Sequence, residues 1–337
     1  MAETRLDDVY TPDVWNKYMN EKTAELTRFW DSGIAVTNND LASLVNGGGT
    51  IIDMPFFNDL VNEPEDVVND NPSQKSDPSK ITSGKEQAHL LMRAKSWSAM
   101  DITKSFAGAD PIDVATSRYA YYWARREQAC LNACLTGIIT DNVANDSSDM
   151  VHSIWDGGDS TSDSTQISST ALLDAAQTLG DAKHDISTLI VNSQLDTTLQ
   201  KNNLNNFTEH SDGKTTWRTY LGWNYVVDDG MPKIKPTGKE KNFSQIAILC
   251  KRGAFAYQPA QHKVPFETER EPSAGNGGGQ EIVYTRKAFV LHPLGYSFDG
   301  AKLSGKTPTN AELAAAARWS RMKERKKIGI AALACSL

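Results

Sequence analysis

The chain has 337 residues, of which 39% are hydrophobic and 23% charged, and its formal net charge is -7. These values indicate a soluble globular protein rather than a disordered chain, with two domains or one large one. An acidic total argues against a dedicated nucleic-acid-binding protein, which carries a basic face. The start, MAETRLDDVYTPDVW, lacks the basic patch and apolar run of a signal peptide. No apolar stretch approaches the ~20 residues that cross a bilayer.

The first predicted element is an N-terminal helix. Thr11 suits the N-cap, Pro12 suits the first helical position, and Ser32-Gly33 ends the pattern. Its apolar stripe consists of Val14, Trp15, Tyr18, Met19, Leu26, Phe29 and Trp30. A stripe this aromatic needs a partner surface. We expect it to dock either on its own domain or on a neighbouring subunit.

A long polar excursion is predicted between two strands. Residues 50–60 read as a strand that leads into an irregular stretch, and residues 88–102 resume an apolar, partly alternating pattern. Between them, residues 61–85 are polar and contain three prolines. A loop of this length in a compact domain is either functional or disordered. The acidic residues near its start, Glu63, Glu65 and Asp66, are interpreted as a solvated tip.

The clearest predicted helix begins at Asp110-Pro111 and ends near Thr140. Apolar residues follow one side of it at helical spacing. About 30 residues at ~1.5 Å each give a rod of roughly 45 Å, well beyond the usual three turns. We expect this rod to act as a spine on which sheets are laid.

The remaining elements alternate irregularly. Residues 141–169 are rich in Asp, Ser, Thr and Gly and predict a loop; the predicted helices are 170–183 and 194–204, and the predicted strands are 185–193, two strands within 217–227 that meet at Gly222, 244–249, 253–257, 280–284 and 288–292. The GNGGG run at 275–279 is interpreted as a flexible hairpin tip. Isolated helices and scattered strands indicate an α+β fold rather than a doubly wound sheet.

Residues 300–307 read GAKLSGKT, which matches the phosphate-binding pattern of many ATPases and GTPases through Gly300, Gly305, Lys306 and Thr307. A working loop of this kind follows a parallel strand and opens directly into a helix. Here Pro308 disfavours helical angles at the preceding residue. A capping box of Thr309 and Glu312 instead starts a helix over ELAAAARW. We interpret the match as a false positive and keep a nucleotide hydrolase as an alternative.

No metal, cofactor or catalytic site is predicted. Cys130 and Cys134 lie one helical turn apart and could bind zinc with Cys250 and Cys335, but buried, inert thiols are the preferred interpretation. Four cysteines in so long a chain do not form a disulfide framework, which suggests synthesis in a reducing cytoplasm. No two of the six histidines, His89, His152, His184, His210, His262 and His292, are closely spaced, and a G-x-S-x-G motif is absent. The basic residues between 318 and 327 are interpreted as the C-terminal part of a helix.

Together these segments resemble the major capsid proteins of tailed bacteriophages, which have the Hong Kong 97 phage shell fold. The run GYSFDGAKLSGKTPTNAELAAAARWSRMKERKKIGIAAL at 295–333 is similar to the end of one capsid subfamily, with a strand, a Thr-Pro-Thr-Asn-Ala-Glu-Leu turn, a Trp-bearing helix and a Lys-x-Ile-Gly-Ile strand. The resemblance implies an N-terminal arm (1–48), an extended loop (49–104), the spine helix of a peripheral domain (105–140), an axial domain (141–240), and peripheral-domain strands with the C-terminal segment (241–337).

The resemblance also implies a function. The chain is expected to self-assemble, as pentamers and hexamers, into the icosahedral head shell of a virion, made in the host cytoplasm and enclosing double-stranded DNA without sequence-specific binding. Scaffold, portal or decoration proteins are further partners that it implies, and it implies neither a membrane nor a cofactor. Some relatives join neighbours through a Lys–Asn bond. Lys75, Lys80 and Lys85 lie in or near the excursion, but no partner Asn or catalytic Glu can be matched, so no crosslink is expected. An encapsulin-like nanocompartment shell is the alternative on the same fold.

Overall fold

The computed structural model describes residues 32–37, 41, 45, 49–60, 63–65, 67–68, 70, 73, 75, 78–107, 111–155, 162, 164–202, 207–211, 216–234, 244–260 and 262–336. The predicted N-terminal helix lies outside these residues, apart from its last positions, where Ser32 and Gly33 form a turn. In this described part of the chain, none of the helices combines the length and the apolar character that crossing a membrane requires.

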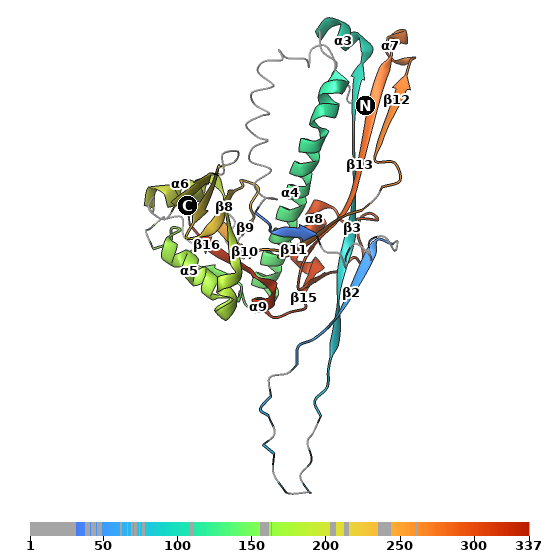
Figure 1. The fold of residues 1–337 in the computed structure, drawn as a ribbon. Coiled ribbons are helices and arrows are strands. Elements are labelled where there is room, and N and C mark those ends of the chain that lie inside the picture. Colours follow the sequence, from blue (N-terminus) through green and yellow to red (C-terminus); the bar gives the residue numbers. More distant parts are fainter. Residues whose placement is uncertain are drawn as a thin grey trace.

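A six-stranded sheet forms one half of the molecule (Figure 1). Its strands are β1 (Ala35–Thr37), β2 (Ile51–Phe57), β3 (Ser83–Met100), β11 (Phe255–Ala260), β12 (Phe266–Glu271) and β13 (Gln280–Pro293). The order is β1-β11-β13-β3-β2, and β12 pairs with the far part of β13. The long antiparallel pair of β3 and β13 is the axis of this sheet, with Leu90 opposite Val290 and Met100 opposite Gln280.

The strands predicted at 280–284 and 288–292 are one continuous strand, β13, so the predicted break between them is wrong. The polar residues that suggested the break have bonding partners on neighbouring elements. Thr285 donates through its hydroxyl to the carbonyl of Lys95 on β3, and the Lys287 ammonium lies 2.5 Å from the Glu127 carboxylate. A strand can carry polar residues in its middle when each is paired in this way. The strands predicted at 50–60 and 88–102 are found as β2 and β3, and β3 begins earlier, at Ser83.

The spine helix is α4 (Pro111–Asn145), preceded by the short α3 (Asp101–Ala107). It ends five residues beyond the predicted Thr140. Asn142 explains the extension, because its side chain donates to Asp149 at 2.7 Å and accepts from the Met150 amide at 3.1 Å. These tertiary bonds stabilise a last turn whose own sequence is a poor helix former. Near the start of α4, Tyr122 packs edge-on against Trp97 of β3, with ring centroids 5.2 Å apart.

A second sheet of eight strands forms the other half. Its members are β4 (Val151–Ser153), β5 (Ile186–Val191), β6 (Phe207–Ser211), β7 (Thr216–Tyr220), β8 (Trp223–Val227), β9 (Lys233–Ile234), β10 (Ser244–Lys251) and β16 (Ile330–Cys335), in the order β4-β16-β10-β5-β8-β7-β6 with β9 on β10. Helices α5 (Ser169–Gln177) and α6 (Ser193–Asn202) cover one face. The other face shares a core with α4. β10 is therefore buried along nearly its whole length, as a strand covered on both faces must be.

Two predictions in this half are corrected. The helix predicted at 170–183 ends at Gln177, because Gly180 adopts a positive φ of 63° and begins a 3-10 turn (Gly180–Asp185). The predicted loop at 141–169 contains the three-residue strand β4, which is too short to leave a pattern in the sequence. The strands and helices predicted at 185–193, 194–204 and 217–227 are found as β5, α6, β7 and β8.

The C-terminal helix predicted over ELAAAARW is also wrong. Only the short helix α8 (Asn310–Leu313) forms, and a 3-10 turn (Ala316–Arg318) follows it. Trp319 begins the strand β15 (Trp319–Arg321), which pairs with β14 (Tyr296–Phe298). Trp319 is buried, donates from its indole nitrogen to the Leu313 carbonyl at 2.7 Å and packs against Phe298 at 4.9 Å. Burial of one tryptophan therefore outweighs the helix propensity of four alanines. The basic run is divided among this turn, β15 and α9 (Arg325–Ile328).

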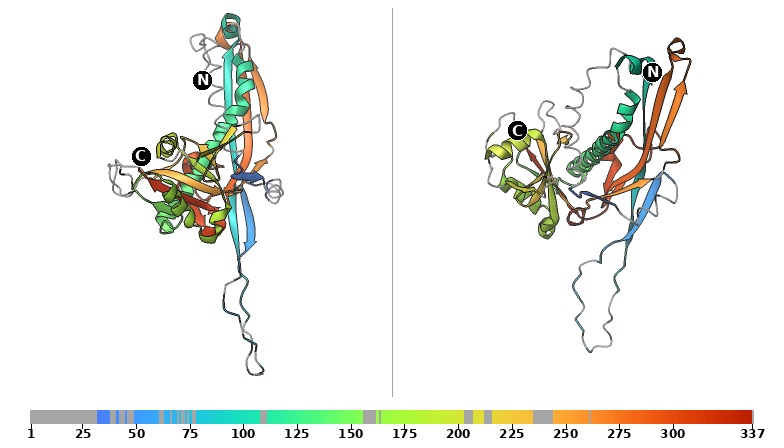
Figure 2. Two further views of the ribbon diagram at one scale, coloured as in Figure 1. Left: turned by 60° about the vertical axis from the view of Figure 1, so that its left-hand side comes forward. Right: turned by 45° about the horizontal axis from the view of Figure 1, so that its top comes forward.

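The molecule is elongated, as two further views also show (Figures 1 and 2). The eight-stranded sheet with its helices forms a compact lobe to one side. The upper half of α4 runs beside β3, β12 and β13, and β12 and β13 are joined by a hairpin with the single turn α7 (Ala274–Gly277) at its tip. At the opposite end, the excursion between β2 and β3 extends well beyond the body of the protein.

Candidate assembly surface

The Walker-like segment connects β14 to α8. β14 is antiparallel to its partner, and α8 has only four residues, so the segment has neither the parallel strand before it nor the helix directly after it that phosphate binding uses. The predicted capping box is confirmed: the Thr309 hydroxyl accepts from the Glu312 amide, and the Glu312 carboxylate accepts from the Thr309 amide.

An internal carboxylate binds the backbone amides of this turn. Glu312 accepts from the Ser304 amide at 2.7 Å and from the Thr309 amide at 2.8 Å. These bonds stabilise the ionised form and lower the pKa of Glu312 to about 2. The amide of Ser304, within the motif, and the amide of Thr309, just after it, therefore already donate to a carboxylate of the protein itself.

The motif residues also have structural contacts. Arg93 of β3 donates to the Pro308 carbonyl at 2.6 Å and to the Thr307 hydroxyl at 3.3 Å. Gly300 lies against His89, and a Cβ at this position would overlap the imidazole ring. Lys306 is exposed. Thus Gly300 and Thr307 hold a connection against β3, while Lys306 points to solvent.

The four cysteines are all buried and unpaired with one another. Burial raises the pKa of Cys250 and of Cys335 to about 12, and it also raises the pKa of the Cys134 and Cys130 thiols. Within the described ranges, no group of three or more His, Cys, Asp or Glu residues has a geometry that could hold a metal ion. Thiols in this environment behave as small apolar side chains.

A buried ionic cluster was not predicted from the sequence. Glu86 of β3 lies 2.8 Å from the Lys323 ammonium and 3.8 Å from His292 of β13, and it accepts from the Gly295 amide at 3.2 Å. Burial alone raises the pKa of Glu86, but the bonds from His292, Lys323 and Gly295 together lower it below its usual value. Glu86 lies more than 200 positions before each of these partners, so no local spacing signals the cluster. It ties the base of the excursion to the C-terminal segment.

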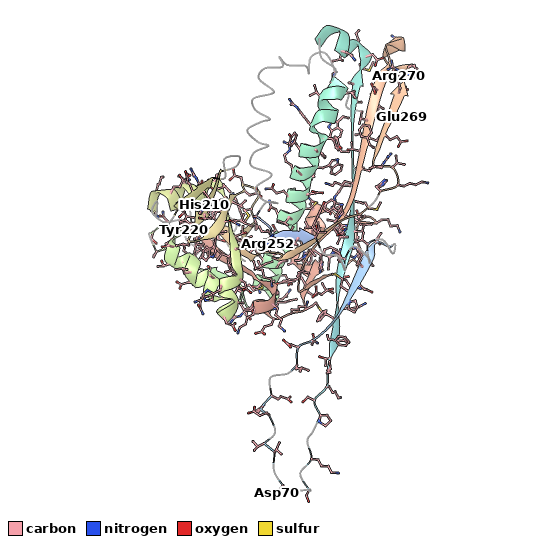
Figure 3. The ribbon with its side chains drawn as sticks, viewed as in Figure 1. Asp70, His210, Tyr220, Arg252, Glu269 and Arg270 are labelled. Carbon is pink, nitrogen blue, oxygen red and sulfur yellow. The ribbon has the colours of Figure 1, made fainter. Side chains whose placement is uncertain are left out.

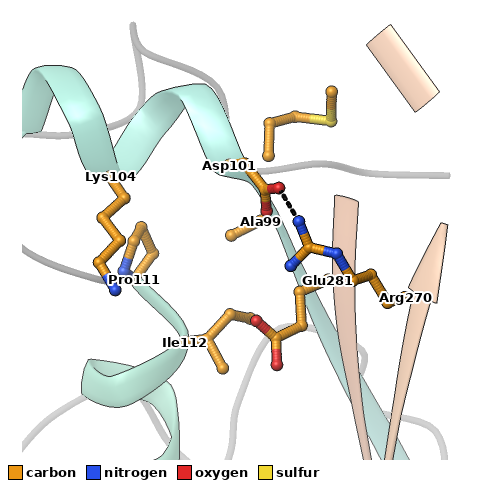
Figure 4. Close-up of a pocket in the computed structure, with 8 residues that line it drawn as sticks. Ala99, Asp101, Lys104, Pro111, Ile112, Arg270 and Glu281 are labelled. Atoms are coloured by element: carbon orange, nitrogen blue, oxygen red, sulfur yellow. Dashed lines mark hydrogen bonds and ion pairs between the residues drawn. The ribbon is translucent and has the colours of Figure 1, made fainter. Parts of the chain in front are cut away.

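A shallow pocket lies where α3, the start of α4 and the sheet meet (Figure 4). It is lined by Ala99, Met100, Asp101, Lys104, Pro111, Ile112, Arg270 and Glu281. Asp101 and Arg270 form an ion pair across it.

The strongest functional feature is the excursion. Its apolar side chains are largely solvent-exposed, with Phe57 at 81%, Val67 at 85% and Val68 at 94%. Leu60 and Ile81 are exposed as well. A monomeric soluble protein rarely displays so many apolar residues on one protrusion, and such surfaces mark interaction sites. The excursion is therefore a projecting arm with the exposed apolar side chains that are typical of an interaction site.

This combination of a spine helix, two sheets and an extended two-stranded arm defines the class of phage shell proteins with the Hong Kong 97 fold. Solved structures with similar folds include the Cyanophage Pam1 capsid (TM-score 0.52, 10% identity, covering 88% of this chain and 87% of that chain). The capsid of an empty GTA particle matches with TM-score 0.51 and 15% identity over 94% of this chain and 90% of the other. The head of Helicobacter pylori bacteriophage KHP40 matches with TM-score 0.50 and 9% identity over 85% and 83%.

The chain belongs to the Gp13-like family of major capsid proteins. The family model, described as major capsid protein 13-like, matches residues 127–329, which is more than half of the chain. The major capsid protein of Bacillus phage SPP1 is 34% identical over 332 residues, 98% of this chain and 97% of that protein. The chain is thus a component of the virion capsid and forms the icosahedral head shell of a tailed phage. The predicted α+β fold and the predicted family are confirmed, and the nanocompartment alternative is not supported.

Proposed function

We propose that this protein acts only as a self-assembling shell subunit, in pentamers and hexamers, without a catalytic residue, a cofactor or a bound nucleotide. The observation that carries the proposal is the excursion with its exposed valines and Phe57. Each of these side chains gains roughly 1.5–3 kcal/mol when it is fully buried. Because a shell repeats one contact over all copies, a few such side chains per subunit suffice to stabilise it.

The segments have distinct roles in this proposal. Residues 1–48 form an N-terminal arm, 49–104 the extended loop, and 105–140 the spine of a peripheral domain that residues 241–337 complete. Residues 141–240 form an axial domain. The two sheets, with α4 packed against both, support a separation into two domains, although β10 and β16 of residues 241–337 belong to the eight-stranded sheet.

The net charge of the chain fits a shell that encloses DNA. A net charge of -7 keeps the inner wall from adhering to packaged DNA, which it encloses without reading sequence. Scaffold, portal or decoration proteins are the further partners in this proposal. Neighbouring subunits hold together without a Lys–Asn bond, so Lys75, Lys80 and Lys85 serve solvation and ion pairing, as Lys85 does with Asp53 at 3.7 Å.

Electron microscopy of the purified protein tests the proposal. We expect pentamers, hexamers or closed shells. A protein that stays strictly monomeric at high concentration would contradict it. Deletion of residues 62–82 should abolish assembly, while circular dichroism still reports a folded subunit, because none of the described residues in this range belongs to the core. Normal shells from this variant would show that the excursion is not the assembling arm.

A further inference from the structure

Two successive side chains of the short helix α9 contact different parts of the molecule. The Lys326 ammonium lies 3.0 Å from the carboxylate of Asp181, in the 3-10 turn of the compact lobe that the eight-stranded sheet forms with its helices. The Lys327 ammonium lies 2.6 Å from the carboxylate of Asp59, at the base of the excursion. These two ion pairs join the lobe and the excursion through a single helical turn.

The excursion is held more firmly by Lys323, which precedes α9. Its ammonium lies 2.8 Å from the Glu86 carboxylate of β3 and 4.6 Å from the centre of the Phe56 ring of β2. One cation therefore contacts both of the strands from which the excursion extends. Glu86 is buried, so water and salt screen this contact less than they screen the exposed pair of Lys327 and Asp59.

The lobe holds α9 from the other side. Only Gly329 separates α9 from β16, a strand of the eight-stranded sheet, and Ile328 at the end of α9 is fully buried. Lys251 of the neighbouring strand β10 donates from its ammonium to the Lys327 carbonyl at 2.7 Å and from its amide to the Gly329 carbonyl at 2.8 Å. Because these bonds and the chain itself join α9 to two strands of the sheet, the helix has to follow any rotation of the lobe.

We propose that residues 323–329, which we call the α9 junction, couple the orientation of the excursion to that of the lobe. A rotation of either part stretches the contacts that the junction makes with the other part, so opening at one end lowers the cost of opening at the other. Such coupling is reciprocal, because a coupling free energy between two sites acts equally in both directions. In a shell, a use that rests on the proposed function, contacts of the excursion with other copies would then set the angle of the lobe.

Amide hydrogen exchange of the unassembled subunit tests the coupling from the lobe to the excursion. Lys251→Met removes the ammonium bond to the Lys327 carbonyl and should speed exchange at the base of the excursion, in β2 and residues 83–89, at least about threefold. The matched control is Lys233→Met, which changes an exposed lysine on β9, a strand that pairs with the other end of β10. This control should leave exchange at the base of the excursion unchanged.

The hairpin of β12 and β13 is an internal reference for this experiment. Its Glu269 and Arg270 lie at the opposite end of the molecule from Asp70, at the tip of the excursion (Figure 3), so neither variant should change its exchange. Exchange at the base of the excursion that Lys251→Met leaves unchanged, or that Lys233→Met speeds equally, would overturn the inference.

A second variant tests the coupling in the reverse direction and decides the question if the first variant fails to fold. Asp59→Lys places a like charge beside Lys327 and should speed exchange in the 3-10 turn Gly180–Asp185 at least about twofold. The matched control is Asp53→Lys on β2, which reverses a charge that is paired with Lys85 at 3.7 Å instead of with α9. The inference fails if the turn exchanges at the same rate in these two variants. Shell formation is measured separately by electron microscopy, so its failure contradicts the proposed function and not the coupling.

Discussion

Arg93 donates to the Pro308 carbonyl at 2.6 Å and so ties β3 to the connection that precedes α8. β3 continues directly into the excursion, and α8 contacts α4 near Cys130, whose thiol lies 3.3 Å from Asn310. Arg93 is thus one of the residues through which β3 is attached to the segment that matches a phosphate loop, together with His89 beside Gly300. Substitutions at the contacts around this segment should therefore change the stability of the subunit.

Replacing Arg93 by Ala should lower the free energy of unfolding by about 1.5–3 kcal/mol, because a hydrogen bond from a charged donor is lost together with a neighbouring bond to Thr307. Urea unfolding of the unassembled subunit measures the change. Lys306→Ala is the control, since the exposed Lys306 side chain should leave stability unchanged. Equal stability of the Arg93→Ala variant and the original protein would contradict the structural role.

Nucleotide binding should be absent, and mutation of Lys306 should make no difference to it. The amides of Ser304 and Thr309 already donate to Glu312, so a phosphate would have to displace a carboxylate from both. Isothermal titration of the subunit with Mg-ATP is expected to give no heat beyond dilution, for the original chain and for Lys306→Ala alike. Saturable binding that Lys306→Ala abolishes would restore the hydrolase alternative.

Gly300→Ala should destabilise the subunit by about 1–3 kcal/mol, because the added methyl group overlaps the buried His89 imidazole. The second glycine of the same motif supplies the control. At Gly305 a Cβ meets only the Thr307 carbonyl at 3.8 Å, so Gly305→Ala should change stability little. Thermal unfolding of the two variants decides between these expectations, and equal melting temperatures would show that His89 can move aside.

The elements that the sequence predicted well are those with a local cause. Pro111 at the start of α4, the β-branched run of β5 and the Thr309–Glu312 capping box each depend on neighbouring residues, and each is found. The failures have non-local causes. Trp319 leaves a predicted helix because its ring fills a site beside Phe298, and β13 continues through Lys287 because Glu127 of α4 lies opposite. Neither partner can be identified from spacing.

Some features of the candidate site could likewise be predicted from the sequence, and others could not. The excursion was recognisable from its length and polarity, because a loop of that kind is unusual in any compact domain. That Val67 and Val68 are among its most exposed apolar side chains could be known only from the fold. The Glu86 cluster was not accessible at all, since Lys323 and His292 approach it from different strands and turns.

The contribution of Glu312 to the stability of the subunit should depend on pH. The pKa of Glu312 in the folded subunit is about 2, lowered chiefly by the Thr309 and Ser304 amides, against an ordinary value of 4.5. A lowered pKa means that the carboxylate stabilises the fold above about pH 4.5 and that this contribution is lost progressively as the pH falls toward 2. The stability difference between the original subunit and Glu312→Gln should therefore be constant at neutral pH and shrink below 4.5. Urea midpoints of the two proteins, compared at each pH between 7 and 3, measure it. A difference that stays constant down to pH 3 would show that the pKa of Glu312 is not lowered in the folded subunit.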